Sequence, residues 1–366
     1  MRQRYAGVMS GTSLDGVDAV IADFAPDTGR PCQFLGSAHI SFPLALRAEL
    51  LALQRASDDE LARAARAANA LADIYAEAIG AALDRIGLAA REVIAAGVHG
   101  QTLRHRPDEG WTLQLNNPAR VAERAGMTVV ADFRSRDVAA GGQGAPLVPA
   151  FHAALFRGDA HRVVVNVGGI ANLTDLPPHG AVRGFDTGPG NVLLDLWHAR
   201  HRGGPYDRDG AWARSGRVDD SMLAALLAEP YFARYPPKST GRDLFHADWL
   251  DAKLANRKIA PADVQATLVA LTARTIADAV RERCASATEV LVCGGGANNA
   301  ALMDALAREL APRTVTTTAA LGVAVEHVEA LAFAWLAREA LAGRPGNLPA
   351  VTGAKGPRVL GAIYPR

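Results

Sequence analysis

Cysteine is scarce in this chain, whose 366 residues include three, Cys32, Cys284 and Cys293. The three share no spacing typical of a metal or redox site, and their odd number cannot form a complete set of disulfides. Such usage fits a protein of a reducing compartment, so we predict a cytoplasmic location. We interpret the cysteines as small apolar residues of the core.

Neither sign of charge is in excess. The 39 basic and 38 acidic residues give a formal net charge of +1, and both kinds are dispersed along the chain. Proteins that bind nucleic acid usually carry clustered basic residues, so we expect no nucleic acid partner. No apolar run approaches the roughly 20 residues that a bilayer-spanning helix needs, so we expect no membrane partner either.

Two common nucleotide-binding motifs are also missing. Nothing matches the Gly-x4-Gly-Lys-Ser/Thr phosphate loop, and no Gly-x-Gly-x-x-Gly follows a first strand in the required context. The two commonest nucleotide-binding folds are therefore excluded. The length of the chain and its 49% of apolar residues predict about two well-packed domains instead.

The first glycine-containing turn lies near the N-terminus, between two apolar segments. Residues 5–8 and 17–24 have the composition of strands, and residues 9–16 between them include two glycines and several hydroxyl or carboxylate side chains. Free main-chain N–H groups and hydroxyls in such a turn suit phosphate oxygens. An ordinary polar hairpin turn is the alternative.

Two further polar segments of the first half follow apolar strands. His99 to Thr102 follow the expected strand 93–98, where open α/β sheets bind ligands, so His99 is either a structural histidine or part of a substrate-contacting turn. The glycine-rich segment 134–146 follows the strand 127–133. It is either an interdomain linker or a clamp for a carboxylate or phosphate, and we place the domain boundary at its start.

The second half begins with the same pattern as the first. A strand at 162–167, a turn at Gly168 and Gly169, and a returning strand at 170–176 that carries Asn172 repeat the opening arrangement. Such a weak internal repeat, offset by about 160 residues, predicts a duplicated domain facing itself across a cleft.

An aspartate and two glycines precede the next expected helix. Asp186 lies at a strand end, and Gly188, Gly190 and Asn191 open the helix 192–200. A carboxylate base and the positive end of a helix dipole would stand together there. A turn or capping role for Asp186 is the alternative, although Asn191 is the better N-cap.

Three consecutive glycines, Gly294, Gly295 and Gly296, separate the expected strand 289–292 from the helix 300–310. Such a run is costly in entropy unless a ligand lies against the backbone, and a flat base or a ribose would fit. The polar segments 206–212 and 238–243 show no period, and we interpret them as scaffold.

Periodicity predicts the remaining elements. The expected helices are 61–86, 118–124, 192–200, 261–283, 300–310 and 325–341. The expected strands are 5–8, 17–24, 93–98, 111–115, 127–133, 162–167, 170–176, 289–292 and 314–318.

Six motifs make the chain resemble the anhydro-N-acetylmuramic acid kinase family of the actin, sugar-kinase and Hsp70 superfamily. They are residues 10–18, 100–102, 131–134 with 141–146, 184–191, 293–296 and 329–334. The resemblance implies an α/β fold of two duplicated actin-like (ribonuclease H-like) domains, with mixed sheets flanked by helices and an interdomain cleft. We place the first domain at 1–133 with 345–366 and the second at 134–344.

The resemblance also implies an activity. Enzymes of this family open the anhydro ring of 1,6-anhydro-N-acetylmuramic acid with water and phosphorylate the freed 6-hydroxyl, which gives N-acetylmuramic acid 6-phosphate in peptidoglycan recycling. It implies ATP and Mg²⁺ as cofactors and a homodimer. A kinase for another sugar and a non-catalytic nucleotide- or sugar-sensing module are the alternatives, and retention of Asp186 argues against the sensor.

Site residues follow from the matched positions. The residues expected to contact the nucleotide are Gly11, Thr12, Ser13, Asp15, Gly168, Gly169, Asn172, Gly188, Gly190, Asn191, Gly294, Gly295 and Gly296. Those expected at the sugar are Ser10, Asp15, Gln101, Thr102, Arg134, Asp186 and Glu329. Asp186 matches the catalytic base, and Asp15 stands where a carboxylate can reach the substrate or a magnesium-bound water. The direct magnesium ligands are unassigned.

The chemistry agrees with these roles. Opening an internal acetal needs a water activated by a carboxylate on the face opposite the leaving oxygen, as in inverting glycosidases, and the γ-phosphate can capture that oxygen. The guanidinium of Arg134 matches a lactyl carboxylate. Two details depart from the family pattern, since Asp243 stands where glutamate is more usual and residues 316–320 lack an acidic residue.

Overall fold

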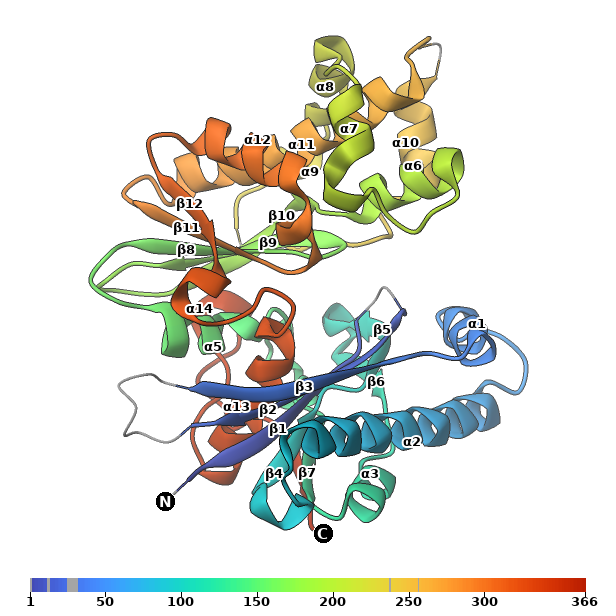
Figure 1. The fold of residues 1–366 in the computed structure, drawn as a ribbon, viewed down its shortest axis with the longest axis vertical. Coiled ribbons are helices and arrows are strands. Elements are labelled where there is room, and N and C mark those ends of the chain that lie inside the picture. Colours follow the sequence, from blue (N-terminus) through green and yellow to red (C-terminus); the bar gives the residue numbers. More distant parts are fainter. Residues whose placement is uncertain (1, 12–13, 25–31, 237, 256) are drawn as a thin grey trace. The chain divides into compact units, whose positions relative to one another are not determined.

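A computed structural model gives the fold of the chain and describes residues 2–11, 14–24, 32–236, 238–255 and 257–366 (Figure 1). The chain divides into two compact units. The first comprises Met1–Leu155 and His327–Arg366, and the second comprises Phe156–Glu326.

The first unit contains a six-stranded mixed sheet in the order β13-β7-β4-β1-β2-β3. Its strands are β1 (Arg4–Met9), β2 (Gly16–Asp23), β3 (Gln33–Ser41), β4 (Ala95–Val98), β7 (Thr128–Ala131) and β13 (Ala362–Tyr364). β1, β2 and β3 pair antiparallel, whereas β4 and β7 continue the sheet parallel to β1. A separate antiparallel pair joins β5 (Gln101–Arg106) to β6 (Trp111–Leu115).

The second unit repeats this topology in a five-stranded sheet of order β10-β9-β8-β11-β12. Its strands are β8 (Arg162–Val167), β9 (Ile170–Leu176), β10 (Arg183–Pro189), β11 (Glu289–Cys293) and β12 (Thr314–Thr317). Again three antiparallel strands come first, and two strands parallel to the first of them follow. The predicted duplication of an α/β domain with a mixed sheet is therefore confirmed.

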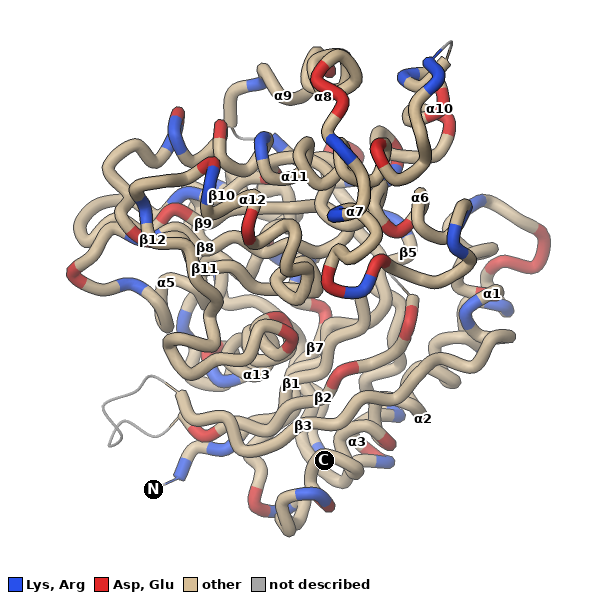
Figure 2. Tube along the Cα trace, turned by 45° about the horizontal axis from the view of Figure 1, so that its top comes forward, with Lys and Arg blue, Asp and Glu red and all other residues tan. Residues whose placement is uncertain are grey.

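Helices flank both sheets. Those of the first unit are α1 (Leu44–Ala52), α2 (Glu60–Ile86), α3 (Pro118–Ala125), α4 (Ser135–Ala139), α5 (Val148–Phe156), α13 (Val328–Leu341) and α14 (Pro349–Thr352). Those of the second are α6 (Val192–Arg202), α7 (Ala211–Ser215), α8 (Asp220–Leu227), α9 (Pro230–Ala233), α10 (Ala247–Leu254), α11 (Pro261–Arg283) and α12 (Ala300–Leu310). Within the described part of the chain, no helix combines the length and the apolar character needed to cross a membrane. Basic and acidic residues are interspersed on each unit, as their distribution along the sequence predicts (Figure 2).

Two helices cover opposite faces of the first sheet. Ala6 and Val8 of β1 share a core with Leu71 and Tyr75 of α2. A Cβ on Gly7, between Ala6 and Val8, would project from the other face of the sheet and collide with main-chain atoms of α13. Because side chains alternate along a strand, α2 and α13 lie on different faces, and glycine lets the backbone of α13 approach β1 closely.

The units end at other positions than predicted, because the segment after β7 and the helix α13 both belong to the first unit. Asp137 is buried and accepts hydrogen bonds from the Gly144 main chain (2.8 Å), Asn347 Nδ2 (2.6 Å) and Thr352 Oγ1 (2.8 Å). Residues 134–146 are therefore tied to the C-terminal segment and contain the short helix α4, so they do not form a linker between the units. The first unit accordingly runs beyond 133 and resumes before 345.

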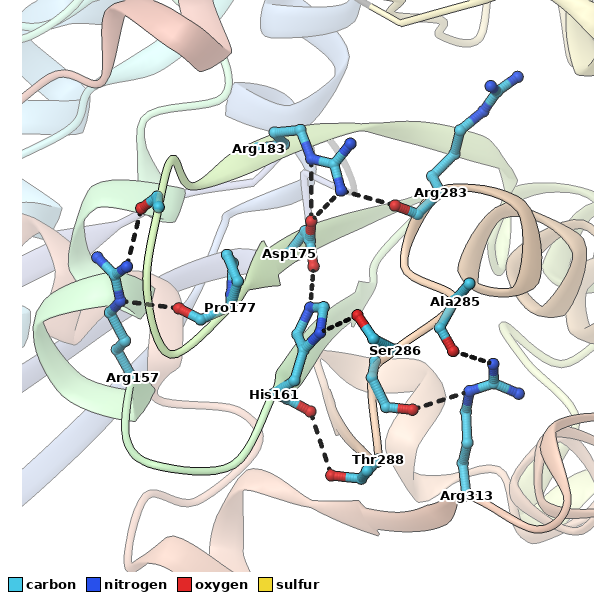
Figure 3. A network of polar contacts seen from close by, with 12 residues as sticks. Arg157, His161, Asp175, Pro177, Arg183, Arg283, Ala285, Ser286, Thr288 and Arg313 are labelled. Atoms are coloured by element: carbon cyan, nitrogen blue, oxygen red, sulfur yellow. Dashed lines mark hydrogen bonds and ion pairs between the residues drawn. The ribbon is translucent and has the colours of Figure 1, made fainter.

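A buried carboxylate fixes the strand pair β9 and β10 in the second unit (Figure 3). Asp175 Oδ2 accepts from Nε and Nη2 of Arg183, at 3.0 and 2.5 Å, and Oδ1 lies 2.6 Å from His161 Nε2. Arg183 Nη2 also donates to the main-chain O of Arg283, at the end of α11. The side chain of Arg183, three residues before Asp186, therefore ties β10 to β9 and to the end of α11.

We expect Asp175→Ala to lower the free energy of unfolding by about 1–3 kcal/mol, since it leaves the donors of Arg183 and His161 without their acceptor. Urea unfolding followed by circular dichroism measures the change. Asp278→Ala is the matched control, because Asp278 pairs with Arg274 and Arg281 on the surface of α11 and such exposed pairs contribute about 0–1 kcal/mol. Equal losses in the two variants would contradict the assignment.

Candidate active site

Arg134 and His99 form the centre of the polar group in the first unit. Nε and Nη2 of Arg134 lie 3.0 and 2.9 Å from His99 Nε2, and Nη1 donates to the main-chain O of Gly144 at 2.8 Å. A guanidinium only donates, so Nε2 is the unprotonated nitrogen of a histidine that accepts. Three of the five guanidinium N–H groups make these bonds, and no described residue accepts from the other two.

Burial sets the charges of this pair. It lowers the pKa of Arg134 to about 10, although the negative charges of Glu329 and Asp137 oppose the shift, so the guanidinium stays charged at neutral pH. Burial, and then the charge of Arg134, lowers the pKa of His99 well below its usual value. A neutral imidazole thus holds a charged guanidinium, and Glu329, in the first turn of α13, acts on the same charge. Sequence reasoning had left the role of His99 open.

The first glycine turn is anchored by two of the residues expected at the sugar. Gln101 is fully buried, and its Nε2 donates to the main-chain O of Gly11 at 3.1 Å. The buried Ser10 hydroxyl lies 2.9 Å from Tyr75 Oη and 3.3 Å from the main-chain O of Gly100. Both side chains therefore hold the turn against the end of β4.

Of the other residues predicted at this turn or beside Gln101 in the sequence, the structure describes Asp15 and Thr102. Thr12 and Ser13 fall outside the described residues. Asp15 is exposed, and its main-chain O accepts from the Phe42 main chain. We expected Thr102 in a turn, but it lies in β5, where its hydroxyl accepts from Gln114 Nε2 at 3.3 Å, because pairing with β6 continues the chain as a strand.

A row of polar side chains crosses the sheet of the second unit. Asp186 of β10 pairs with Asn172 of β9, and Asn172 pairs with Asn166 of β8. Paired positions share a face, and this face is opposite to the one on which Val165 and Phe185 join the core with α11 and α12. Sequence reasoning missed Asn166, although a single amide within an apolar strand was a usable signal.

Asp186 is a partly buried carboxylate held by residues far along the chain. Its Oδ2 accepts from the Thr240 main-chain N at 3.0 Å, its main-chain O accepts from Tyr231 Oη at 2.8 Å, and its main-chain N donates to the O of Lys238. Burial raises the pKa of Asp186 to about 6, against the hydrogen bond from Thr240 and the charge of Lys238. A carboxylate with a pKa this close to neutrality suits a general base. A register shift in the β9–β10 pairing follows directly, between Asp186 and Gly188, and such bulges often re-aim side chains at active sites.

The glycine turn between β8 and β9 is bonded to the start of α6. The main-chain N atoms of Gly190 and Val192 donate to Gly169 O at 2.9 and 3.0 Å, and that of Asn191 donates to Gly168 O at 2.8 Å. These N–H groups, which we expected to be available to an anion, are thus already used. Asn191 is the N-cap as predicted, but its side chain donates to the O of Val167 instead of capping the helix. The turn itself is open, because a Cβ at Gly169 would meet nothing within 4 Å.

Packing accounts for two of the three consecutive glycines. A Cβ at Gly294 would collide with Asn166 Oδ1, and a Cβ at Gly296 would collide with Val167. The close approach of β8 therefore requires both glycines without any ligand. Gly295 is exposed and is the member of the run that a ligand can approach.

No carboxylate cage for a metal is present in the described ranges. They contain no group of three or more His, Cys, Asp or Glu side chains placed to hold an ion. Mg²⁺ in nucleotide sites usually keeps several waters and takes one or two carboxylates together with phosphate oxygens. That mode of binding needs no cage of protein carboxylates.

Known proteins resemble this chain over its whole length. Residues 3–366 match the family model described as anhydro-N-acetylmuramic acid kinase. The protein of that name from Cupriavidus pinatubonensis is 59% identical, over 99% of this chain and 98% of its own length, and the one from Thiobacillus denitrificans is 56% identical, over 99% and 97%. Among solved structures, the activator of the 2-hydroxyisocaproyl-CoA dehydratase from Clostridium difficile with bound ADPNP has a TM-score of 0.47 and 14% identity, over 91% of this chain and 93% of that one.

Proposed function

The chain belongs to the anhydro-N-acetylmuramic acid kinase family, and we infer from this that it is an ATP-dependent kinase of 1,6-anhydro-N-acetylmuramic acid. We propose that Asp186 is its catalytic base. The observation that carries this proposal is the environment of Asp186, a partly buried carboxylate whose pKa is raised to about 6 by loss of solvation and whose Oδ2 is held by a main-chain N–H. A module that only senses a nucleotide or a sugar needs no such base.

The reaction proposed for Asp186 opens the ring and transfers the phosphoryl group together. Asp186 takes a proton from a water, whose oxygen forms a bond to the anomeric carbon while the bond from that carbon to O6 breaks. As that bond breaks, O6 forms its bond to the γ-phosphorus of ATP, and the β,γ-bridging oxygen leaves with ADP. A general base contributes about 10²–10⁴-fold to such a step, and capture of O6 by the phosphorus replaces a strong general acid.

We propose that Arg134 binds the lactyl carboxylate of the sugar. Its charge and its two remaining N–H groups suit a carboxylate, which accepts two parallel bonds from a guanidinium. His99 fixes the orientation of the fork. The other residues proposed to contact the sugar are Ser10, Asp15, Gln101, Thr102 and Glu329.

For the nucleotide, we propose contacts from the glycine turns of both units. The open turn at Gly168 and Gly169 suits phosphate oxygens, and the exposed Gly295 suits the adenosine. The remaining proposed contacts are Gly11, Thr12, Ser13, Asp15, Asn172, Gly188, Gly190, Asn191, Gly294 and Gly296. When bound, Mg²⁺ would neutralise charge on the phosphates, and Asp15 is the carboxylate that we propose to reach a magnesium-bound water. We further propose that the chain acts in the cytoplasm as a homodimer.

Water labelling tests the proposed reaction. The protein is incubated with Mg-ATP and 1,6-anhydro-N-acetylmuramic acid in oxygen-18 water, quenched early and analysed by mass spectrometry. We expect one heavy oxygen at the anomeric carbon of a phosphorylated product, with none in the phosphate ester. Unlabelled N-acetylmuramic acid 6-phosphate in the same water is the control for spontaneous anomeric exchange. Absence of product, or product that gains label no faster than this control, would contradict the mechanism.

A further inference from the structure

The polar segment 238–240, interpreted from sequence as scaffold, runs beside the proposed catalytic base. Lys238 accepts at its main-chain O from the N–H of Asp186 at 3.3 Å. Two residues later the main-chain N of Thr240 donates to Asp186 Oδ2 at 3.0 Å. The segment therefore pairs with β10 at Asp186 and bonds to the carboxylate itself.

The side chain of Lys238 anchors this segment to α9. Its ammonium donates to the main-chain O of Phe232 at 3.1 Å and to that of Tyr231 at 3.4 Å, and it lies 4.8 Å from the centroid of the Tyr231 ring. These contacts occupy two of the three ammonium donors and add a cation–π attraction. Loss of the ammonium would release the segment from α9.

Tyr231 links the same helix directly to the base. Its ring is buried at 1% exposure, packs edge-on against Phe245 and faces the ammonium of Lys238. Its hydroxyl donates to the main-chain O of Asp186 at 2.8 Å. Asp186 is thus held at its main-chain N and O and at one carboxylate oxygen.

We propose that Tyr231 and Lys238 are positioning residues, which hold Asp186 so that Oδ2 stays bonded to Thr240 and Oδ1 receives the proton of the attacking water. The proposal rests on the role of Asp186 proposed above. No described residue donates a hydrogen bond to Oδ1, which leaves that oxygen for a water. A general base must lie within hydrogen-bond reach of the proton that it takes, so its orientation controls the rate.

The charge of Lys238 gives this role a pH signature. Among the described groups, Lys238 and Tyr231 are the titratable ones that interact with the carboxylate, and the ammonium of Lys238 lowers the pKa of Asp186. Removing the ammonium, or the bond from Thr240, raises the pKa of the base. Because the base works only when ionised, the acid limb of the rate profile then moves to higher pH.

Lys238→Met tests the proposal in the full-length enzyme. We expect the single-turnover rate to fall about tenfold or more, with KM for ATP and for the sugar within about threefold and the acid limb raised by about half a pH unit or more. Lys238→Arg should move the limb back toward the parent value. Lys253→Met is the matched control, since its ammonium lies 5.6 Å from the Trp249 ring centroid in the same unit and pairs with Glu229, not with Asp186 or residues 238–240.

Tyr231→Phe decides the question if Lys238→Met does not fold, because it keeps the buried ring and removes only the hydroxyl. We expect a fall of about threefold to tenfold in the single-turnover rate, and Tyr206→Phe, which removes an exposed hydroxyl, should change nothing. If Lys238→Met and Tyr231→Phe keep the single-turnover rate and the acid limb of the parent enzyme, the positioning role is overturned. An active Asp186→Asn enzyme would instead refute the role of the base, so the two failures are distinguishable.

Discussion

Asp186→Asn is expected to lower kcat by about 10²–10⁴-fold while the affinity for ATP stays within about threefold. The amide has nearly the shape of the carboxylate, and its oxygen still accepts from the Thr240 main-chain N. It cannot, however, take a proton from water. Rapid-quench measurement of sugar phosphate formation gives kcat, and titration calorimetry with a non-hydrolysable ATP analogue gives the affinity.

The pH profile of kcat in the parent enzyme is a second test of Asp186 as the general base. Burial raises the pKa of Asp186 to about 6. The base is active when deprotonated, so kcat should rise with pH, reach half its maximum at about pH 6 and level off above about pH 7. A profile that stays flat down to pH 4.5 would exclude a carboxylate of this pKa as the base.

A surface aspartate supplies the control for the Asp186 variant. Asp251 lies on α10 and pairs with the exposed Arg200, so Asp251→Asn should leave kcat within about twofold. Near-normal turnover in Asp186→Asn would remove Asp186 from the role of base. The same loss in both variants would point to a general effect of the substitution on the fold.

Most of the fold could be predicted where the apolar period is strong. The expected bounds of α11, α12, β8 and β9 agree with the structure, because each of these elements has a clear pattern and a clear end. The strand β3 was missed, since Gly36, Ser37 and His39 interrupt its pattern. Its pairing with β2 keeps it extended, which is a tertiary contact and leaves no local signal.

The candidate site could be predicted only in part, for a similar reason. Asp186 and Arg134 were identifiable because their motifs resemble those of a family. The contacts that orient them were not, since Thr240 acts through its main-chain N–H and His99 through a neutral nitrogen. Neither of these two contacts produces a recognisable residue spacing in the sequence. In the run at 294–296, close packing on β8 requires Gly294 and Gly296 whether or not a ligand binds there, and nothing in the sequence indicated this second cause.

Arg134→Met is expected to weaken binding of 1,6-anhydro-N-acetylmuramic acid about 100-fold, which corresponds to about 2–3 kcal/mol for the loss of a charge-assisted pair of hydrogen bonds. KM for ATP should stay within about threefold. Arg134→Lys keeps the charge but not the fork, so its affinity should lie between those of the parent and Arg134→Met. Titration calorimetry in the absence of ATP measures the affinity of both variants for the sugar.

The second ligand needed for this test is the same anhydro sugar without its lactyl group, 1,6-anhydro-N-acetylglucosamine. Arg134 also holds His99 and the main-chain O of Gly144, so a collapse of this group would weaken binding of both sugars equally. Recognition of the carboxylate requires instead that Arg134→Met bind the second sugar as the parent does. Arg136→Met, at an exposed arginine of α4, is the matched control and should bind both sugars normally. Equal losses for the two sugars in Arg134→Met would assign Arg134 to the architecture of the first unit, because only a lactyl-dependent loss identifies a carboxylate as its ligand.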